Sequence, residues 1–298
     1  MELGSVGSGL DVESIVKALV DADVAPKNNS LNRQETQLTA ELSALGTLKA
    51  SLSSLDTSLA DLHDGSAFDL LSIDAPAAVN ITQTGAVASG QYSINVNTLA
   101  AAQVLASSGF ASSSTVVGTG TLTIKVGAPS YSSGSSGAYS SFSEDVSKTV
   151  SVTIDSSNNT LSGIRDAINA SAAGVTAALV VDGTQTRLLL TADDSGASNA
   201  ISVVVDDDDT IDTNNSGLSQ LAYNYDSGTS TFTGNLSETR ASSDAAFELN
   251  GLSLTNSSNS IVGLVDGLNF TLKKVTTSSE SILIQRDTAA IESKVQAF

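Results

Sequence analysis

Apolar side chains recur every three to four residues near the start of the chain, and this spacing predicts an amphipathic helix. Asp11 precedes the apolar positions, where a carboxylate can cap the free N–H groups of a first helical turn. Ala25-Pro26 then predicts a stop or a kink. A helix this short is marginal alone in water, so its apolar side predicts a covering partner. We call these residues the N-terminal stripe: Leu10, Val12, Ile15, Val16, Leu19 and Val20, with Leu10 and Ile15 at hydrophobic-staple positions.

A second and longer helix is predicted from about residue 27 to residue 64. Its leucines follow each other at steps of four or three residues, as at the a and d positions of a coiled coil. One repeated step of three is typical of a stammer, and Gly65 is the expected helix stop. The pattern predicts a partner helix, either later in this chain or on another molecule. We call these residues the leucine seam: Leu38, Leu42, Leu45, Leu48, Leu52, Leu55, Leu59 and Leu62.

From about residue 66 apolar and polar positions alternate, which predicts β-strands. A Ser/Gly-rich stretch over residues 128–143 is expected to form a flexible surface loop. Residues 160–174 predict a short helix capped by Thr160, and residues 287–298 predict the start of another. The strand-like segments are 78–84, 91–100, 121–127, 148–155, 175–181, 185–192, 200–205, 247–254, 268–274 and 281–287.

Two dipeptides predict tight hairpins. Asp182-Gly183 lies between two strand-like segments, and Asn250-Gly251 lies between two alternating arms. Both pairs suit turns that need a positive φ. The chain therefore has a helical N-terminus, a β-rich middle and an incipient helix at its C-terminus, and the predicted fold class is α+β.

Composition narrows the function classes. The 298 residues suffice for two or three domains, and 40% of them are apolar although only 4% are aromatic. A formal net charge of −19 opposes binding to nucleic acid or to an anionic membrane, since both need clustered Lys and Arg. Without cysteine, disulfides and thiolate metal sites are excluded. No secretory signal or membrane-span pattern occurs, which fits a cytoplasmic protein or one exported without a cleaved signal.

No cluster of residues predicts catalysis, a cofactor or a metal ion. The single histidine, His63, is expected at the C-terminal end of the long helix, where a cation favours the helix dipole, rather than in a catalytic triad. No carboxylate pair stands out for glycoside hydrolysis. The acidic run Asp206–Asn215 is expected to be a solvated loop, with Ca²⁺ binding as the alternative, although it lacks the glycine and terminal Glu of an EF-hand loop.

Three segments, in this order, resemble the FliD family of flagellar filament cap proteins, also called hook-associated protein 2. Residues 9–29, GLDVESIVKALVDADVAPKNN, followed by the leucine seam, look like the family's N-terminus. Residues 158–196 look like a β–helix–β element of hook-associated proteins and some flagellins. Residues 245–274 are similar to the segment that precedes the family's C-terminal half. Most of the family's C-terminal helical region is absent from these residues, so we expect either that the chain is a fragment or that the stem is completed otherwise.

The resemblance implies a structural, non-enzymatic protein at the distal tip of the bacterial flagellar filament. Helices from both chain ends would form a stem, and β-rich heads would form a ring-like homo-oligomeric plate beneath which exported flagellin folds and inserts. The implied partners are other copies, flagellin, hook-associated junction proteins and an export chaperone, with no cofactor. Secretion would follow the flagellar type III route. The N-terminal stripe and the leucine seam would bind partners, and the stripe is expected to become helical on assembly.

Two alternatives stay open. A hook–filament junction protein would share helical termini and β modules, but its start should lack the pattern GSGLDVESIVKALV. A secreted adhesin or glycan-binding β protein would explain the Ser/Thr-rich loops but not the leucine seam. The expected domains are a leader with a short assembly helix (1–26), a coiled-coil stem (27–65), an inner β-rich head domain (66–105 plus 239–287), an inserted outer β-rich head domain (106–238) and the start of a C-terminal stem helix (288–298).

Overall fold

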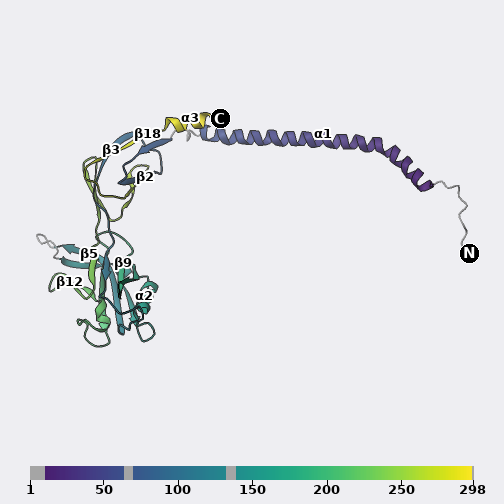
Figure 1. Cartoon of the computed structure of the whole chain (residues 1–298). Helices are drawn as coiled ribbons and strands as arrows, with labels where there is room; N and C mark the ends of the chain where they lie inside the picture. Colours follow the sequence, from purple (N-terminus) through teal and green to yellow (C-terminus); the bar gives the residue numbers. More distant parts are fainter. Residues whose placement is uncertain (1–10, 64–69, 132–138, 297–298) are drawn as a thin grey trace, which may run out of the picture. The chain divides into compact units, whose positions relative to one another are not determined.

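The computed structural model describes residues 11–63, 70–131 and 139–296 (Figure 1). Residue contacts divide the chain into a helical unit, residues 1–70 with 287–298, and a β-rich unit, residues 71–286. The helical unit contains the long helix α1 (Val12–His63) and the short helix α3 (Thr288–Gln296). A long helix followed by antiparallel sheets confirms the predicted α+β class.

Helix α1 is one continuous helix of 52 residues with Pro26 inside it. Asp11 caps its first turn as predicted, because the Ser14 N–H donates to Asp11 Oδ1 at 3.0 Å. The predicted division into two helices at Pro26 is wrong. Proline lacks an N–H and its ring crowds the preceding turn, and a long helix accommodates both by bending. Figure 1 shows a bend of this kind in the N-terminal part of α1.

The N-terminal stripe also departs from its expected behaviour. Its backbone is helical from Val12 onward in the single chain, whereas the sequence predicted ordering only on assembly. The reason lies in the continuity of α1, since adding residues to an existing helix avoids the unfavourable nucleation step that a separate short helix must make. Assembly would therefore bury the side chains of the stripe rather than create its helix.

Two antiparallel sheets of the β-rich unit share a first core. One has the strand order β1-β18-β3-β14-β15 and the other the order β16-β17-β2. Ile94, Phe247 and Phe270 are among its largest fully buried side chains. The strands are β1 (Leu71–Asp74), β2 (Val79–Gln83), β3 (Gly90–Thr98), β14 (Ala245–Leu249), β15 (Leu252–Asn256), β16 (Ser260–Val265), β17 (Leu268–Leu272) and β18 (Glu280–Arg286).

The remaining strands share a second core with helix α2 (Leu161–Ala170). A six-stranded sheet has the order β12-β11-β10-β5-β6, with β7 also paired to β5, and a four-stranded sheet has the order β13-β4-β9-β8. Two 3-10 helices, η2 (Val146–Lys148) and η3 (Gly217–Leu221), also lie in this region. The strands are β4 (Val104–Ala106), β5 (Gly120–Tyr131), β6 (Tyr139–Glu144), β7 (Val150–Ile154), β8 (Val175–Asp182), β9 (Gln185–Ala192), β10 (Ala200–Asp207), β11 (Tyr223–Asp226), β12 (Thr231–Gly234) and β13 (Ser237–Arg240).

The predicted helix cap and both predicted hairpins are confirmed. Thr160 caps α2, because its Oγ1 accepts from the Gly163 N–H at 3.1 Å. The β8–β9 hairpin turns at Gly183, where φ is +64°. The β14–β15 hairpin turns at Asn250 and Gly251, with φ of 51° and 79°. Positive φ at both central residues is what a two-residue type I′ turn requires.

The Asn250-Gly251 turn provides a test of backbone strain. A Cβ at Gly251 would meet no atom within 4 Å, so the positive φ alone resists substitution. We expect Gly251→Val to lower the free energy of unfolding by roughly 1–2 kcal/mol, because a β-branched residue strongly disfavours this conformation. Denaturant unfolding measures the loss. Gly251→Asn is the control, since Asn tolerates positive φ, and an unchanged midpoint for Gly251→Val would contradict the turn.

The Ser/Gly-rich stretch over residues 128–143 is more ordered at its flanks than predicted. β5 continues to Tyr131 and β6 begins at Tyr139, with Pro129 paired to Phe142. Only residues 132–138 of the stretch lie outside the described residues. A cluster of rings around Phe232 holds the start of β6 against β11 and β12. This aromatic cluster comprises Tyr139, Phe142, Tyr223 and Tyr225, with ring centroids 5.1–5.7 Å from that of Phe232.

Candidate functional site on helix α1

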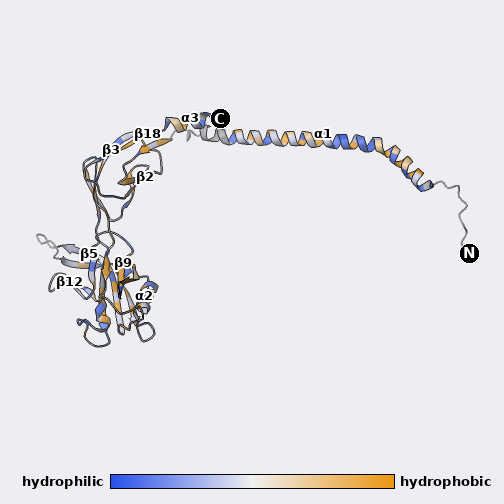
Figure 2. Cartoon of the chain, in the orientation of Figure 1, coloured by the Kyte–Doolittle hydropathy of each residue, from blue (hydrophilic) through white to orange (hydrophobic). Residues whose placement is uncertain are grey.

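The leucine seam lies along α1 with its described side chains in solvent. Their exposed fractions run from 45% at Leu55 to 72% at Leu42. Figure 2 shows apolar and polar residues interleaved along this helix. Leu59 and Leu62 belong to α1, but their side chains lie outside the described part of the chain. The described seam residues are Leu38, Leu42, Leu45, Leu48, Leu52 and Leu55.

The N-terminal stripe is exposed as well. Ile15, Val16, Leu19 and Val20 have exposed fractions of 48% to 73%. Leu10 lies outside the described residues, as does the side chain of Val12. The partner that covers these side chains was predicted either later in the chain or on another molecule. The described side chains of the seam and the stripe are exposed, and their covering partner stays a prediction.

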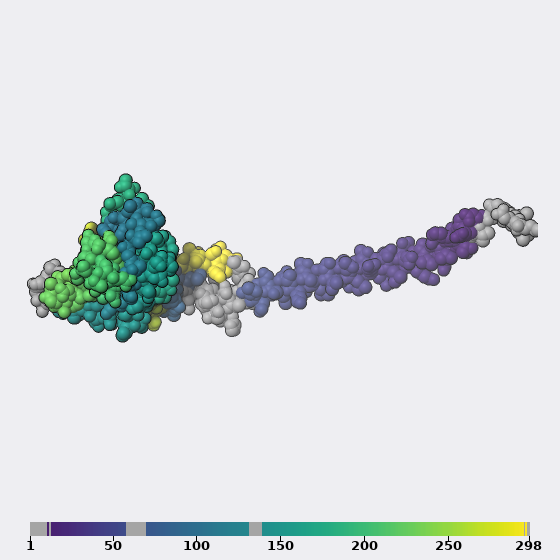
Figure 3. Space-filling model, turned by 90° about the horizontal axis from the view of Figure 1, so that it is seen from below, coloured from purple at the N-terminus to yellow at the C-terminus, as the bar shows by residue number. Residues whose placement is uncertain are grey.

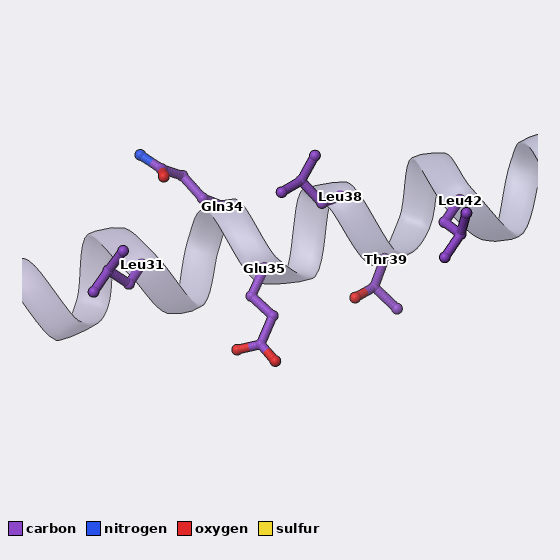
Figure 4. A pocket seen from close by; sticks show the side chains of 6 residues that line it. All are labelled: Leu31, Gln34, Glu35, Leu38, Thr39 and Leu42. Carbon is purple, nitrogen blue, oxygen red and sulfur yellow. The ribbon is translucent and has the colours of Figure 1, made fainter.

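Leu31 extends the seam by one heptad and was missed in the sequence. It is 60% exposed and lies seven residues before Leu38. Figure 4 shows Leu31, Leu38 and Leu42 on the same stretch of α1 as Gln34, Glu35 and Thr39, which line a shallow depression with them. Gln34 and Glu35 stand where a leucine would link Leu31 to Leu38, so the pattern of leucines at steps of three or four begins only at Leu38. The heptad spacing was the available signal.

The spacing of the seam determines how a partner helix would bind. Apart from one repeated step of three, the leucines follow a seven-residue repeat, which drifts about 20° per heptad around a straight helix, so a partner that follows them must wind left-handedly. Burying one such side chain is worth roughly 1.5–3 kcal/mol before entropy costs. Figure 3 shows α1 as an extended rod of side chains. The seam thus suits binding to another helix.

The polar faces of α1 contribute little beyond solubility. Lys17 pairs with Asp21 at 2.9 Å and Lys27 with Asp23 at 3.9 Å, each four residues apart. Exposed helix pairs of this kind are worth about 0.3–0.5 kcal/mol. The apolar side chains therefore dominate the binding energy that α1 offers.

The N-cap of α1 predicts a pH-dependent first turn. The hydrogen bond from the Ser14 N–H lowers the pKa of Asp11 below its ordinary value of 3.8. A lowered folded-state pKa means that the cap contribution is present above pH 3.8 and is lost as the pH falls through the folded value. We expect the Ser14 amide resonance to titrate in this acidic window. Asp11→Asn keeps a capping oxygen without the charge, so a titration that survives in this variant would contradict the assignment.

The acidic run Asp206–Asn215 differs from the predicted solvated loop at its beginning. Asp206 and Asp207 belong to β10, and Asp207 is only 4% exposed. Its Oδ2 accepts from the Ser219 N–H at 2.8 Å and from Ser219 Oγ at 3.1 Å. A carboxylate with its own donors tolerates burial, and this compensation was invisible in the sequence. In the described part of the chain no group of three or more His, Asp or Glu side chains is arranged to hold a metal ion.

The side chains of Asp209 and Asn214 bind their own loop. Asp209 accepts from Asn214 Nδ2 at 3.0 Å and from the Ile211 N–H at 2.8 Å, and these bonds lower the pKa of Asp209. His63 ends α1 as predicted, and its side chain lies outside the described part. Among the described helices, none is both long and apolar enough to span a membrane. The face of α1 therefore remains the candidate site.

Two family models match the chain at its ends. The model of the flagellar hook-associated protein 2 N-terminus matches residues 8–103, and the model of the C-terminus matches residues 242–298. The B-type flagellar hook-associated protein 2 of Pseudomonas aeruginosa is 31% identical over 304 residues, covering 99% of this chain and 60% of that protein. The flagellar hook-associated protein 2 of Escherichia coli K12 is 31% identical, covering 86% of this chain and 50% of that protein. The chain thus spans 50–60% of the length of these relatives.

Solved structures share the fold. The crystal structure of the flagellar cap protein FliD D1-D2-D3 domains from Escherichia coli superposes with a TM-score of 0.63 at 28% identity, covering 86% of this chain and 65% of that one. FliD (HAP2) from Pseudomonas aeruginosa PAO1 superposes with a TM-score of 0.56 at 30% identity, covering 75% and 91%. These matches describe a structural, non-enzymatic family. The chain therefore belongs to the flagellar hook-associated protein 2 family of FliD cap proteins.

Proposed function

We propose that this chain acts in the cap at the distal tip of the bacterial flagellar filament. There it would form an oligomeric plate that promotes the folding and insertion of exported flagellin. The observation that carries the proposal is the exposed leucine seam on α1 in a chain of this family. A helix that exposes leucines along several heptads favours an oligomer, in which these side chains are buried, over a monomer.

The proposal includes partners and a location. The seam and the N-terminal stripe would bind neighbouring copies or the terminal helices of other flagellar subunits. Flagellin, the hook-associated junction proteins and an export chaperone are the further partners. Secretion would follow the flagellar type III route, and the protein would act outside the cell. The family assignment favours this function over a hook–filament junction protein and over an adhesin.

The proposed domain division is supported by the two separate cores. First-core residues lie within 78–100 and 245–284, and second-core residues lie within 105–236. This pattern suits the insertion of one domain into another, as predicted with an inner domain over 66–105 plus 239–287 and an outer domain over 106–238. Leu105 packs in the second core, so we place that boundary just before β4. Entry and exit side by side keep the entropy cost of such an insertion small.

Genetic complementation tests the function. A strain that lacks the corresponding gene should release unpolymerised flagellin, and the complete protein of which this chain forms part should restore filaments. Restoration should fail when Leu42 and Leu45 are replaced by aspartate, while the variant is still secreted. Filaments of normal length in the deletion strain would refute the cap function. Restoration by the aspartate variant would instead refute the role of the seam.

Electron microscopy of the purified complete protein separates the alternatives. Rings or paired rings favour a cap. Monomers that also bind glycans favour an adhesin, and filaments of the deletion strain that detach at their base favour a junction protein.

A further inference from the structure

The two cores of the β-rich unit are joined by polar contacts at a narrow crossing. The chain passes between them at residues 100–104 and returns at residues 240–244. Ala101 and Ser243 exchange two backbone hydrogen bonds, of 2.9 and 3.0 Å, where the two passages meet. The buried apolar clusters of the two cores have no residue in common. Apolar packing therefore does not by itself fix one core against the other.

The first passage is held firmly on both sides of two alanines. Asn259 of the first core accepts from the Ala100 N–H and donates to the Ala100 carbonyl, both at 2.8 Å. Gln103 is 2% exposed and its Oε1 accepts from the Ile201 N–H of the second core. Between these anchors lie only Ala101, whose carbonyl also accepts from the Gly196 N–H at 3.3 Å, and Ala102, whose carbonyl accepts from Arg240 Nε at 2.8 Å. Such a short segment between two rigid bodies has the geometry of a hinge.

A loop of the second core reaches across this hinge. The Ala197 N–H donates to Asp244 Oδ1 at 2.7 Å, and Ser195 Oγ donates to the Ser257 carbonyl at 2.8 Å. Asp244 and Ser257 belong to the side of the first core, flanking β14 and β15. Asn199 holds the loop in shape, since its Nδ2 donates to the Ser195 carbonyl at 2.8 Å. We call residues 195–199 the crossing loop.

Gly196 makes this close approach possible. It is buried and its φ is +106°, a value that L side chains rarely adopt. A Cβ at this position would lie 2.7 Å from Ser257 Cβ and 3.1 Å from Asp244 Oδ1. The loop therefore contacts both residues only with glycine at its centre. The contact of the crossing loop with Ser257 and Asp244 is therefore specific to this sequence.

We propose that the crossing loop is a latch that sets the angle between the two cores, with Asp244 as its positioning residue. The latch consists of a few hydrogen bonds at a partly exposed site, so it can open without unfolding either core. Release frees the second core to turn about the paired passages at Ala101 and Ser243. A hydrogen bond to a charged acceptor is among the stronger single contacts, which makes Asp244 the largest contributor. This inference concerns the orientation of the cores and does not depend on the cap function.

Distance measurement between two spin labels tests the latch. The chain has no cysteine, so Val181→Cys in β8 and Val262→Cys in β16, which are 71% and 78% exposed, accept labels uniquely. In the full chain we expect one narrow distance distribution. Asp244→Ala should raise the population of other distances by roughly 10- to 100-fold, the effect of losing a hydrogen bond to a charge. Circular dichroism and thermal unfolding report whether both cores remain folded.

Asp194→Ala is the matched control. Asp194 is an exposed carboxylate next to the same loop, but it pairs with Lys148 of the second core at 2.7 Å. Its removal should leave the distances unchanged. Should Asp244→Ala fail to fold, Asp244→Asn and Ser195→Ala weaken the latch more gently and should broaden the distribution less. A distribution as narrow as in the wild type, in every latch variant that folds, would overturn the proposal.

Discussion

Replacing both Leu42 and Leu45 with aspartate is expected to abolish self-association of the protein. Their side chains are 72% and 63% exposed, so the single chain loses no internal packing. In an assembled coiled coil the same positions would be buried, and two unpaired carboxylates there would cost several kcal/mol. We expect the association constant to fall by at least about 100-fold. Sedimentation equilibrium over a range of concentrations measures this loss.

Substitution on the opposite side of α1 gives the control. Ser43→Asp with Thr47→Asp adds the same charge to the same stretch of helix, away from the leucines. This variant should associate like the wild type. Equal association by the leucine and control variants would show that the seam is no interface. A wild-type chain that stays monomeric at high concentration would rule out self-association through it.

Truncation of Phe270 is expected to be among the most damaging single changes in the first core. Its side chain is fully buried, with 0% exposure, on the central strand β17 of the three-stranded sheet. Phe270→Ala should lower the free energy of unfolding by about 3–5 kcal/mol, because it removes apolar burial and leaves a cavity. Urea unfolding followed by circular dichroism measures the change.

Val262 on the neighbouring strand β16 provides the control for this core. It is 78% exposed, so Val262→Ala should change the unfolding free energy by less than about 0.5 kcal/mol. A loss for Phe270→Ala as small as that for Val262→Ala would contradict the assignment of the first core. Hydrogen exchange of Phe270→Ala would locate the loss of stability, since strands of the second core should retain more protection than β2, β16 and β17.

The long helix shows what periodicity can and cannot predict. Every described seam leucine lies on α1, because regular spacing of apolar side chains is a local property of the sequence. The division at Pro26 failed for the opposite reason. Proline raises the local cost of a helix, but whether the helix bends or ends depends on the helical residues on both sides. The exposure that makes the seam a candidate site required the structure.

In the β-rich unit too, the local sequence pattern predicted some elements and missed others. Strands with clear alternation, such as β9 and β18, were predicted together with both hairpin turns. Short strands such as β1 and β4 were missed, because three or four residues are too few to show a period. The contact of Ala197 with Asp244 joins residues 47 positions apart, and no local pattern encodes it. Pairings of this range depend on the whole topology.

The aromatic cluster around Phe232 makes the protein a convenient object for spectroscopy. The chain has five tyrosines and no tryptophan. Four of the tyrosines lie on β5, β6 and β11, and only Tyr92 lies on a strand of the first core. Intrinsic fluorescence therefore reports mainly on one half of the β-rich unit. Melting followed by tyrosine emission and by backbone circular dichroism should give two different curves whenever the halves unfold separately.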